Sequence, residues 1–218
     1  FLYAVGLKPE VYIPHRLNEG YGPNKNAMDK IKEEHKSSLL VTVDCGIVAF
    51  EPLEYAKSIG LDVIILDHHL SQEKLPAVDA VVNPNRFDEE FEYKNLAAVG
   101  VVFLATIVIR SKLRDKGFFK DGKFEEPDLM QYLDLVALGT VCDVMRLVGV
   151  NRAFVHQGLK LIKQRKNLGL ATLANVVGMD SVPKSHHLGF VIGPRINAGG
   201  RVGQGHLGPK LLSTDDSI

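Results

Sequence analysis

The sequence predicts an α/β protein with an open, mostly parallel sheet, helices on both faces of that sheet, and a helical connecting region after it. Two features of the 218 residues predict this class. Short apolar stretches rich in β-branched residues alternate with helix candidates before Leu96, and helical patterns alone follow it. The length is sufficient for one large domain, or for one domain and part of another.

The first half is expected to form strand, helix, strand, helix, strand and strand, in that order. Asn24 or Asn26 can cap the first helix, Pro52 lies in the first turn of the second, and Gly60 ends it in the C′ position. The expected elements are a strand at 11–13, a helix ending near 36, a strand at 38–43, a helix ending at 60, and strands at 61–66 and 80–82.

The second half is expected to be helical, with helices at about 96–116, 128–138, 151–165, 170–177 and 206–213. The longest apolar run, Leu96 to Ile109, is shorter than the roughly 18 residues that a membrane span needs. We therefore expect a core helix that is buried on most sides and becomes amphipathic from Arg110 onwards. An exposed connection follows it.

The composition limits the classes of function. The formal net charge is zero, which argues against a generally cationic nucleic-acid binder, so a polyanionic partner must meet a local patch or a metal. Two cysteines without CxxC spacing make neither a disulfide framework nor a structural zinc site. This use of cysteine fits a reducing cytoplasm.

Polar side chains follow two of the expected strands at the point where each strand ends. Asp44 follows one strand, and Asp67, His68 and His69 follow the next. Parallel neighbours place such residues at the same carboxyl edge, where open α/β sheets bind ligands. Because successive side chains point to different sides, we expect at most one of the two histidines to face the same centre as Asp44.

A third acid, Asp143, stands alone in the apolar stretch from Leu135 to Val144, after an expected helix break at Gly139. A buried, unpaired carboxylate is costly, and coordination of a metal removes that cost. Carboxylates and imidazoles together form a ligand set that suits Mn²⁺ or Mg²⁺, unlike the cysteine ligands of a structural zinc site. The sequence therefore predicts a metal centre in which Asp44 and Asp143 take part.

Simpler explanations exist for each residue taken alone. A DHH tripeptide is common by chance, Asp44 can be a helix cap, and Asp143 can be a buried cap after Gly139. Cys45 and Cys142 each adjoin a candidate ligand, and a role as small apolar filler at a crowded site explains both of them better than reactivity does.

Three segments, "VTVDCG", "ILDHH" and "LGTVCDV", resemble the second, third and fourth motifs of the DHH phosphoesterase superfamily, in the same order. Further segments are similar to those of the RecJ family, which belongs to this superfamily. RecJ proteins are bacterial exonucleases specific for single-stranded DNA. These segments are "IPHRLNEGYGPN", "VNPNR", "LGFVIGPRINAGGRVG" and "LLSTDD". The resemblance covers nearly all of the chain.

The resemblance implies a two-metal site that takes Mn²⁺ or Mg²⁺, with two ions in the complete enzyme. Asp44 would bridge the ions, and His68 and Asp143 would be further metal ligands. The candidate catalytic residues are Asp67 and His69. Asp67 would orient its neighbours, and His69 would lie against the scissile phosphate.

The resemblance also implies contacts to phosphate and DNA. The candidates are Arg16, Arg195, Asn197 and Arg201. Guanidinium groups fork onto phosphate oxygens, and the glycine-rich setting of Arg195 and Arg201 lets the backbone approach a ligand, with a hinge as a competing role. For Arg16, a surface ion pair with Glu19 is an alternative of nearly equal weight.

Two departures from the family pattern stand out. The family's first motif, an Asp-rich strand end, has no counterpart and would lie before Phe1, and Met145-Arg146 replaces the usual Val-Pro. We therefore expect an internal fragment with an incomplete metal site, which is inactive alone. The expected division is 1–150 as phosphoesterase core, 151–192 as helical part and connector, and 193–218 as hinge and start of a DHHA1-type domain.

The resulting expectation is a monomeric, cytoplasmic 5′-to-3′ exonuclease acting on single-stranded DNA in recombination and repair. Single-stranded-DNA-binding protein and a helicase are the protein partners that the resemblance implies, and no membrane is involved. Two alternatives stay open. One is a DHH phosphoesterase acting on short oligonucleotides or cyclic dinucleotides, and the other is a catalytically inactive DHH-fold protein that only binds partners.

Overall fold

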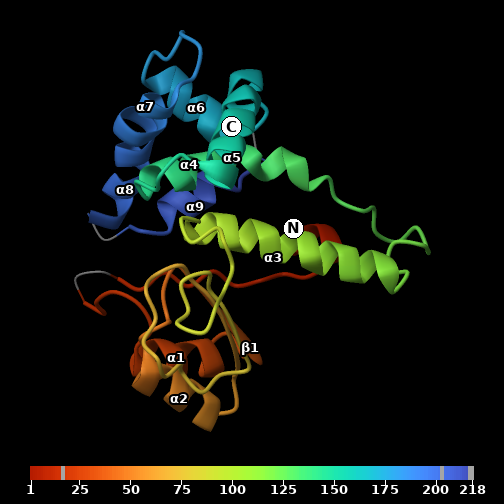
Figure 1. Cartoon of the computed structure of the whole chain (residues 1–218), viewed down its shortest axis with the longest axis vertical. Helices are drawn as coiled ribbons and strands as arrows, with labels where there is room; N and C mark the ends of the chain where they lie inside the picture. The colour runs from red at the N-terminus through yellow and green to blue at the C-terminus, as the bar shows by residue number, and fades with distance from the viewer. Residues whose placement is uncertain (16–17, 202–203, 216–218) are drawn as a thin grey trace.

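A small parallel sheet and a cluster of helices form two layers on opposite sides of the long helix α3 in the computed structural model (Figure 1). The structure describes residues 1–15, 18–201 and 204–215. The strands are β1 (Leu39–Val43), β2 (Asp62–Leu66) and β3 (Ala80–Val82). The helices beside and between them are η1 (Tyr3–Val5), α1 (Lys25–Glu33), α2 (Phe50–Ser58) and α3 (Ala98–Asp115). These strands and helices confirm the expected α/β class.

The sheet is parallel throughout, in the order β1-β2-β3, and its register pairs Val43 with Leu66. Helices α1 and α2 cover one face, because alternate residues of β2, Val63 and Ile65, are fully buried in a core that both helices share. The expected caps are correct. The Asn24 side chain accepts a hydrogen bond from the N–H of Ala27, and Gly60 follows α2 with a φ of 79°.

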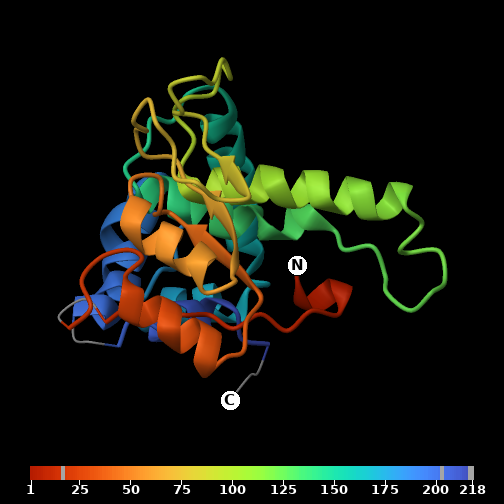
Figure 2. The same ribbon diagram turned by 90° about the horizontal axis from the view of Figure 1, so that it is seen from below.

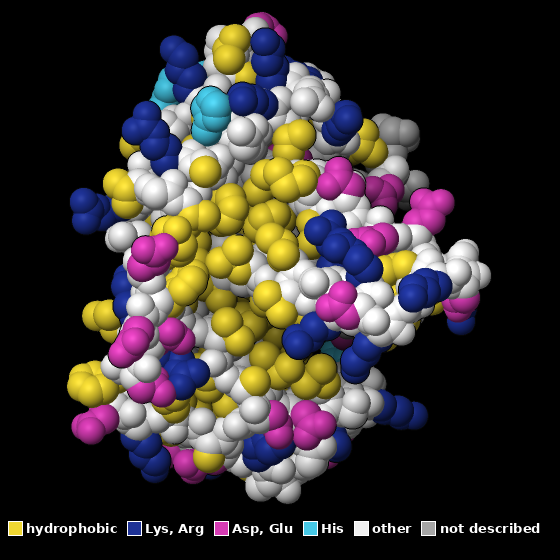
Figure 3. All heavy atoms as spheres, turned by 45° about the vertical axis from the view of Figure 1, so that its right-hand side comes forward, with side chains coloured by type: hydrophobic (Ala, Val, Ile, Leu, Met, Phe, Trp, Pro, Cys, Tyr) yellow, Lys and Arg dark blue, Asp and Glu magenta, His cyan; other side chains and the backbone are white. Residues whose placement is uncertain are grey.

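The other face of β1 is only partly covered by the described residues. Leu39, Val41 and Val43 point to that side and are 50%, 42% and 49% exposed. The expected strand at 11–13 is wrong, because this segment lies in an extended conformation without a strand partner among the described residues. On the face drawn in Figure 3, hydrophobic side chains gather in a broad central band.

The second half of the chain is a helical layer. Its elements are η2 (Leu129–Tyr132), α4 (Leu133–Cys142), α5 (Gly149–Gln164), α6 (Leu168–Val176), α7 (Ser185–His187), the π-helical turn η3 (Leu188–Ile192), α8 (Gly193–Arg201) and α9 (Leu207–Leu212). Helices α4 and α5 pack closely, because Gly158 lets α5 approach the backbone of Leu133. A Cβ atom at Gly158 would lie 2.2 Å from the Leu133 oxygen.

Two expectations about individual helices need correction. Gly139 does not break α4, which continues to Cys142, and the glycine instead allows contact with Val99 of α3. Helix α3 is buried only in its first half, since Val108 and Ile109 are 54% and 46% exposed. Its second half and the following connection protrude from the rest of the protein (Figure 2). No helix among the described residues is long and apolar enough to cross a membrane.

The described residues from 193 onwards, where a hinge was expected, form two helices. Helix α8 follows η3 directly, and α9 packs against α6 and α8. Ile196 and Leu212 join the same hydrophobic core as α4, α5 and α6. The domain division at 193 stays a prediction.

Candidate metal centre

The first two strands end side by side and present their acids at one edge. The N–H of Asp44 donates to the Leu66 carbonyl over 3.0 Å, and the N–H of Asp67 donates to the Val82 carbonyl over 3.1 Å. The parallel ladder therefore continues one residue past each strand and fixes where the chain turns away. Both acids lie at the carboxyl edge of the sheet, as strand-end placement predicts.

Asp44, His68 and Asp143 meet at this edge. The Nε2 atom of His68 lies 3.3 Å from Oδ1 of Asp44 and 3.3 Å from Oδ2 of Asp143. The His68 side chain is 8% exposed, whereas the side chains of Asp44 and Asp143 are 53% and 36% exposed. The imidazole thus forms the buried base of a cluster whose carboxylates face solvent.

Helix α4 delivers Asp143 to the cluster. The acid is the C-cap of that helix, and its N–H donates to the carbonyl of Gly139 over 2.9 Å. A backbone cap is therefore part of its role, but its side chain reaches His68 as well. Asp44, by contrast, is no helix cap, since α2 has Ala49 in that position.

Asp67 is fully buried and holds the DHH segment in place. Its carboxylate accepts hydrogen bonds from the N–H groups of Ile47, His68 and His69, and Oδ1 lies 2.7 Å from Nδ1 of His69. A buried carboxylate with this many donors acts as a rigid anchor. It also leaves Nε2 as the free nitrogen of His69.

Both histidines lie near Asp44, contrary to the expectation that at most one would. Single ligand atoms of Asp44, His68 and His69 all lie within 4.8 Å of one another. The reason is that β2 ends at Leu66, so the alternation of a strand no longer applies to the residues after it. The two rings are tilted by 59° with centroids 4.7 Å apart.

Two asparagines hold the backbone of the DHH segment from the neighbouring loop. The Asn83 side chain donates to the His69 carbonyl over 2.9 Å, and the Asn85 side chain donates to the His68 carbonyl over 2.6 Å. Asn83 also accepts from the N–H of Asn85. Strand-end placement does not predict these two roles, and the "VNPNR" segment is the signal for them in the sequence.

Electrostatics at the cluster reflect crowded acids. The hydrogen bond with Asp44 raises the pKa of His68, against the effect of burial, and the charge of Asp143 adds to the rise. Burial raises the pKa of Asp143. The charge of Asp44 adds to this rise, and the charge of His68 opposes it. Burial also pushes the pKa of Asp67 upward, but the bond from His69 and the backbone N–H groups outweigh it and lower that pKa.

The backbone is strained beside both exposed acids. Asp44 has a φ of 60°, and Val144, directly after Asp143, has a φ of 57°. This left-handed conformation is uncommon for aspartate and a true outlier for a β-branched residue. The Tyr21 hydroxyl donates to the Asp44 carbonyl over 2.6 Å and helps to hold that turn. Strain of this kind is concentrated at functional sites.

The donor set fits a divalent cation. Carboxylate oxygens of Asp44 and Asp143 each lie 3.3 Å from Nε2 of His68, so three separate segments bring oxygen and nitrogen donors to one imidazole. His68 Nδ1 lies 3.0 Å from the Leu96 carbonyl, so Nε2 is left to face the two acids. Without a cation, the single imidazole of His68 only partly offsets the electrostatic repulsion between the two carboxylates.

The two neighbouring cysteines differ in exposure, because Cys45 is partly buried, as the expected role as filler requires, whereas Cys142 is exposed. Burial raises the pKa of Cys45 to about 11, with the charges of Asp67 and Asp44 adding to it, so this thiol is a poor nucleophile. Cys142 has a raised pKa for the same first reason, burial, and its sulfur leaves no room for a side chain at Gly193.

The candidate DNA-binding residues are only partly placed. Arg16 lies outside the described residues, and the Glu19 carboxylate pairs with Lys30. Arg195 and Arg201 are exposed on α8, and Nη1 of Arg195 donates to the Val191 carbonyl over 2.7 Å. Their contact with a phosphate stays a prediction.

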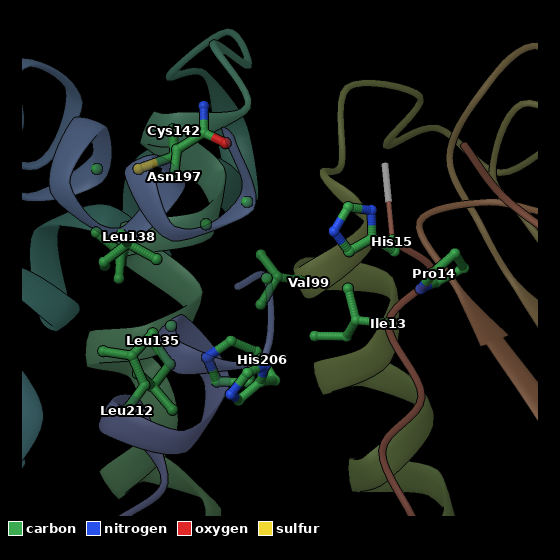
Figure 4. Close-up of a pocket in the computed structure, with 17 residues that line it drawn as sticks. Ile13, Pro14, His15, Val99, Leu135, Leu138, Cys142, Asn197, His206 and Leu212 are labelled. Carbon is green, nitrogen blue, oxygen red and sulfur yellow. The ribbon is translucent and has the colours of Figure 1, made fainter. Parts of the chain in front are cut away.

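A cavity of about 690 Å³ lies beside the metal cluster rather than on it. Figure 4 shows its walls, with Ile13, Pro14 and His15 of the extended segment on one side and α4 with the C-terminal helices on the other. Asn197 and Cys142 line it, whereas Asp44, His68 and Asp143 do not. The chemistry of the cluster, and not the size of this cavity, therefore marks the candidate site.

The parallel sheet and the acid–imidazole cluster at its carboxyl edge define an α/β protein whose candidate site lies at the strand ends, where open α/β sheets bind ligands. A model of the DHH family, N-terminal domain, matches residues 1–140, and the chain belongs to this family.

Curated relatives are single-stranded-DNA-specific RecJ exonucleases. The Salmonella typhimurium protein is 41% identical over 94% of this chain and 36% of its own length. The Escherichia coli protein is 40% identical with the same coverage. The chain thus spans about a third of the length of these relatives.

Solved structures agree with the fold. A RecJ structure bound to manganese has a TM-score of 0.81 and 36% identity, and the match covers 99% of this chain and 51% of that one. A magnesium complex from Thermus thermophilus has a TM-score of 0.57 and 33% identity, over 82% of this chain and 23% of that one.

Proposed function

We propose that the chain is the phosphoesterase part of an exonuclease that degrades single-stranded DNA and requires Mn²⁺ or Mg²⁺. The observation that carries the proposal is the convergence of Asp44, His68 and Asp143 on one point at the carboxyl edge. Support comes from the exonuclease names of relatives about 40% identical, and from the manganese and magnesium bound in solved RecJ structures that are 36% and 33% identical to this chain.

Each residue has a stated role in this proposal. Asp44 and Asp143 would hold the cation with their carboxylate oxygens, and His68 would complete the set with Nε2. A divalent cation supplies a polarised phosphoryl oxygen and a more acidic water. Asp67 fixes His69 through Nδ1, so that Nε2 of His69 can donate to a phosphate oxygen in the same opening.

The finer parts of the proposal concern the whole protein. It acts from 5′ to 3′ as a monomer in the cytoplasm during recombination and repair, and it works with single-stranded-DNA-binding protein and a helicase. Arg16, Arg195, Asn197 and Arg201 contact the DNA backbone. The divisions at 150 and 192 separate the phosphoesterase core and its helical connector from a DHHA1-type domain.

The test is nucleotide release by the whole protein from single-stranded DNA labelled at one end, with duplex DNA and single-stranded RNA as comparisons. We expect Mn²⁺-dependent release of label from the 5′ end first, and none in EDTA. Release of the 3′ label first would contradict the polarity. Cleavage of cyclic dinucleotides alone would favour the small-substrate alternative. Absence of any hydrolysis in Mn²⁺ and Mg²⁺ would favour the non-enzymatic one.

A further inference from the structure

Asn151, in the first turn of α5, is a buried amide outside the DHH motifs. It is 1% exposed. Its Nδ2 atom donates to the carbonyl of Asn95 over 2.6 Å and to the carbonyl of Arg146 over 3.1 Å. One side chain therefore joins the segment before α3 to the segment between α4 and α5.

The orientation of this amide is fixed by its partners. Both partners are carbonyl oxygens, which only the NH₂ group can satisfy. Its Oδ1 atom is buried and has no hydrogen-bond partner among the described residues. The two Nδ2 bonds contribute to stability, and the segments that they join connect Asn151 to the candidate site.

The first of the two bonds leads to His68. Asn95 precedes Leu96, whose carbonyl lies 3.0 Å from Nδ1 of His68. Leu96 is 1% exposed, so this backbone is held on all sides. Fixing the Asn95 carbonyl fixes the adjoining peptide, and with it the acceptor that keeps the Nδ1–H of His68 in place.

The second bond leads to Asp143. Arg146 closes the turn after this acid, and that turn contains Val144 with its unfavourable φ of 57°. The N–H of Met145 donates to the Thr140 carbonyl over 3.2 Å at the start of the turn, and Asn151 holds its other end. Anchoring both ends keeps the strained residue, and the acid before it, in one conformation.

We propose that Asn151 is a positioning residue that sets both His68 and Asp143 for the metal. Asn151 orients Nε2 of His68 through the Leu96 carbonyl. It orients the Asp143 carboxylate through the turn that ends at Arg146. The inference rests on the proposed metal role of His68 and Asp143. It adds a residue that touches neither the metal nor the substrate.

The test compares Mn²⁺ affinity of the whole protein, measured by electron paramagnetic resonance, between wild type, Asn151→Ala and Asn151→Asp. Loss of a group that orients a metal ligand lowers metal affinity about 10–100-fold, and we expect a loss in this range. The matched control is Asn167→Ala. Asn167 also bonds two segments, through Leu170 and Leu212, but it lies in a different part of the helical layer. The Mn²⁺ affinity of the Asn167→Ala variant should equal that of wild type.

A second readout separates positioning from general stability. In the Mg²⁺-loaded wild type, ¹⁵N NMR should find the His68 proton on Nδ1, and this proton should exchange faster with solvent in Asn151→Ala. Asn151→Ser, which keeps one donor, replaces the alanine variant if that variant does not fold, with a smaller expected loss.

The inference is overturned if Asn151 variants bind Mn²⁺ as tightly as Asn167→Ala does, or if the wild-type His68 proton lies on Nε2. The first result leaves the proposed function intact as long as wild type binds Mn²⁺, whereas a proton on Nε2 would remove His68 from the metal site and overturn both proposals. If wild type binds none, the proposed function fails, and this inference fails with it.

Discussion

His68 and Asp143 meet although they belong to different layers of the protein. The imidazole follows β2 of the sheet, the acid ends α4 of the helical layer, and Nε2 of the one lies 3.3 Å from Oδ2 of the other. The cluster therefore forms only when the sheet and the helices are packed together across α3 (Figure 1). Changes that loosen this packing should weaken the metal site without touching a ligand.

Asp44→Asn should abolish DNA hydrolysis by the whole protein and leave the fold intact. Loss of a carboxylate that would hold the metal should reduce kcat/KM at least about a thousandfold, or about 4 kcal/mol of transition-state stabilisation. The free energy of unfolding without metal should change by less than about 1 kcal/mol, because the acid is half exposed. Asp62→Asn, at the other end of the same strand pair, is the control. Near-normal turnover of Asp44→Asn would refute its role.

Asn83→Ala should destabilise the protein and reduce activity together. Asn83 is 2% exposed, and its removal leaves the His69 carbonyl and the Asn85 N–H without their partner. The expected cost is about 1–3 kcal/mol in urea unfolding. The more exposed Asn85, changed in the same way, should cost less stability and still lower activity, because its bond to the His68 carbonyl is lost. Equal activity of both variants and wild type would show that this loop does not support the site.

The carboxylate of Glu19 should make stability depend on pH. Hydrogen bonds from Lys30, the Tyr12 hydroxyl and the backbone N–H of His15 lower the pKa of Glu19 to about 2. A lowered folded-state pKa contributes stability above the unfolded value of 4.5, and this contribution disappears as pH falls towards 2. Glu19→Gln should therefore be less stable than wild type at pH 6, on the order of 1 kcal/mol after solvent screening, and nearly equal at pH 2.

Urea unfolding at several pH values measures this difference. The exposed Glu54→Gln on α2 is the control and should follow wild type at every pH. A Glu19→Gln deficit that is independent of pH would contradict the assignment.

Gly158→Ala should disrupt the contact between α4 and α5. Its Cβ atom would lie 2.2 Å from the Leu133 oxygen and 2.4 Å from the Ala137 Cβ atom, so the helices must move apart. Overpacking of this kind costs about 1–3 kcal/mol or more. Gly200→Ala, in α8 with no atom within 4 Å of the added Cβ, should be neutral or slightly stabilising. Thermal unfolding compares the two, and equal midpoints would refute the packing argument.

Local patterns were sufficient to predict the strands and most helices. Apolar β-branched runs gave β1, β2 and β3 within one residue, and Asn24 and Gly60 gave their helix ends. The individual candidate ligands, but not their meeting, followed from acids at two strand ends and one isolated acid in an apolar helix. These features depend on residues close together in the chain, which is why they could be read from the sequence.

The remaining features depend on distant contacts. Whether 11–13 pairs as a strand depends on a neighbouring strand, and Gly139 is a helix contact rather than a break because Val99 lies against it. The supports from Asn83 and Asn151 join segments that are far apart in the chain. The approach of His69 to Asp44 depends on a turn after β2 that strand alternation does not describe.

The binding of a divalent metal by Asp44, His68 and Asp143 underlies every other role proposed for this site. Anomalous diffraction from crystals of the whole protein grown in Mn²⁺ tests it directly. We expect an anomalous peak about 2.0–2.4 Å from Nε2 of His68 and from a carboxylate oxygen of each acid. The peak should be absent from crystals of Asp44→Asn. Manganese bound elsewhere, with no peak at these three residues in millimolar Mn²⁺, would contradict the account.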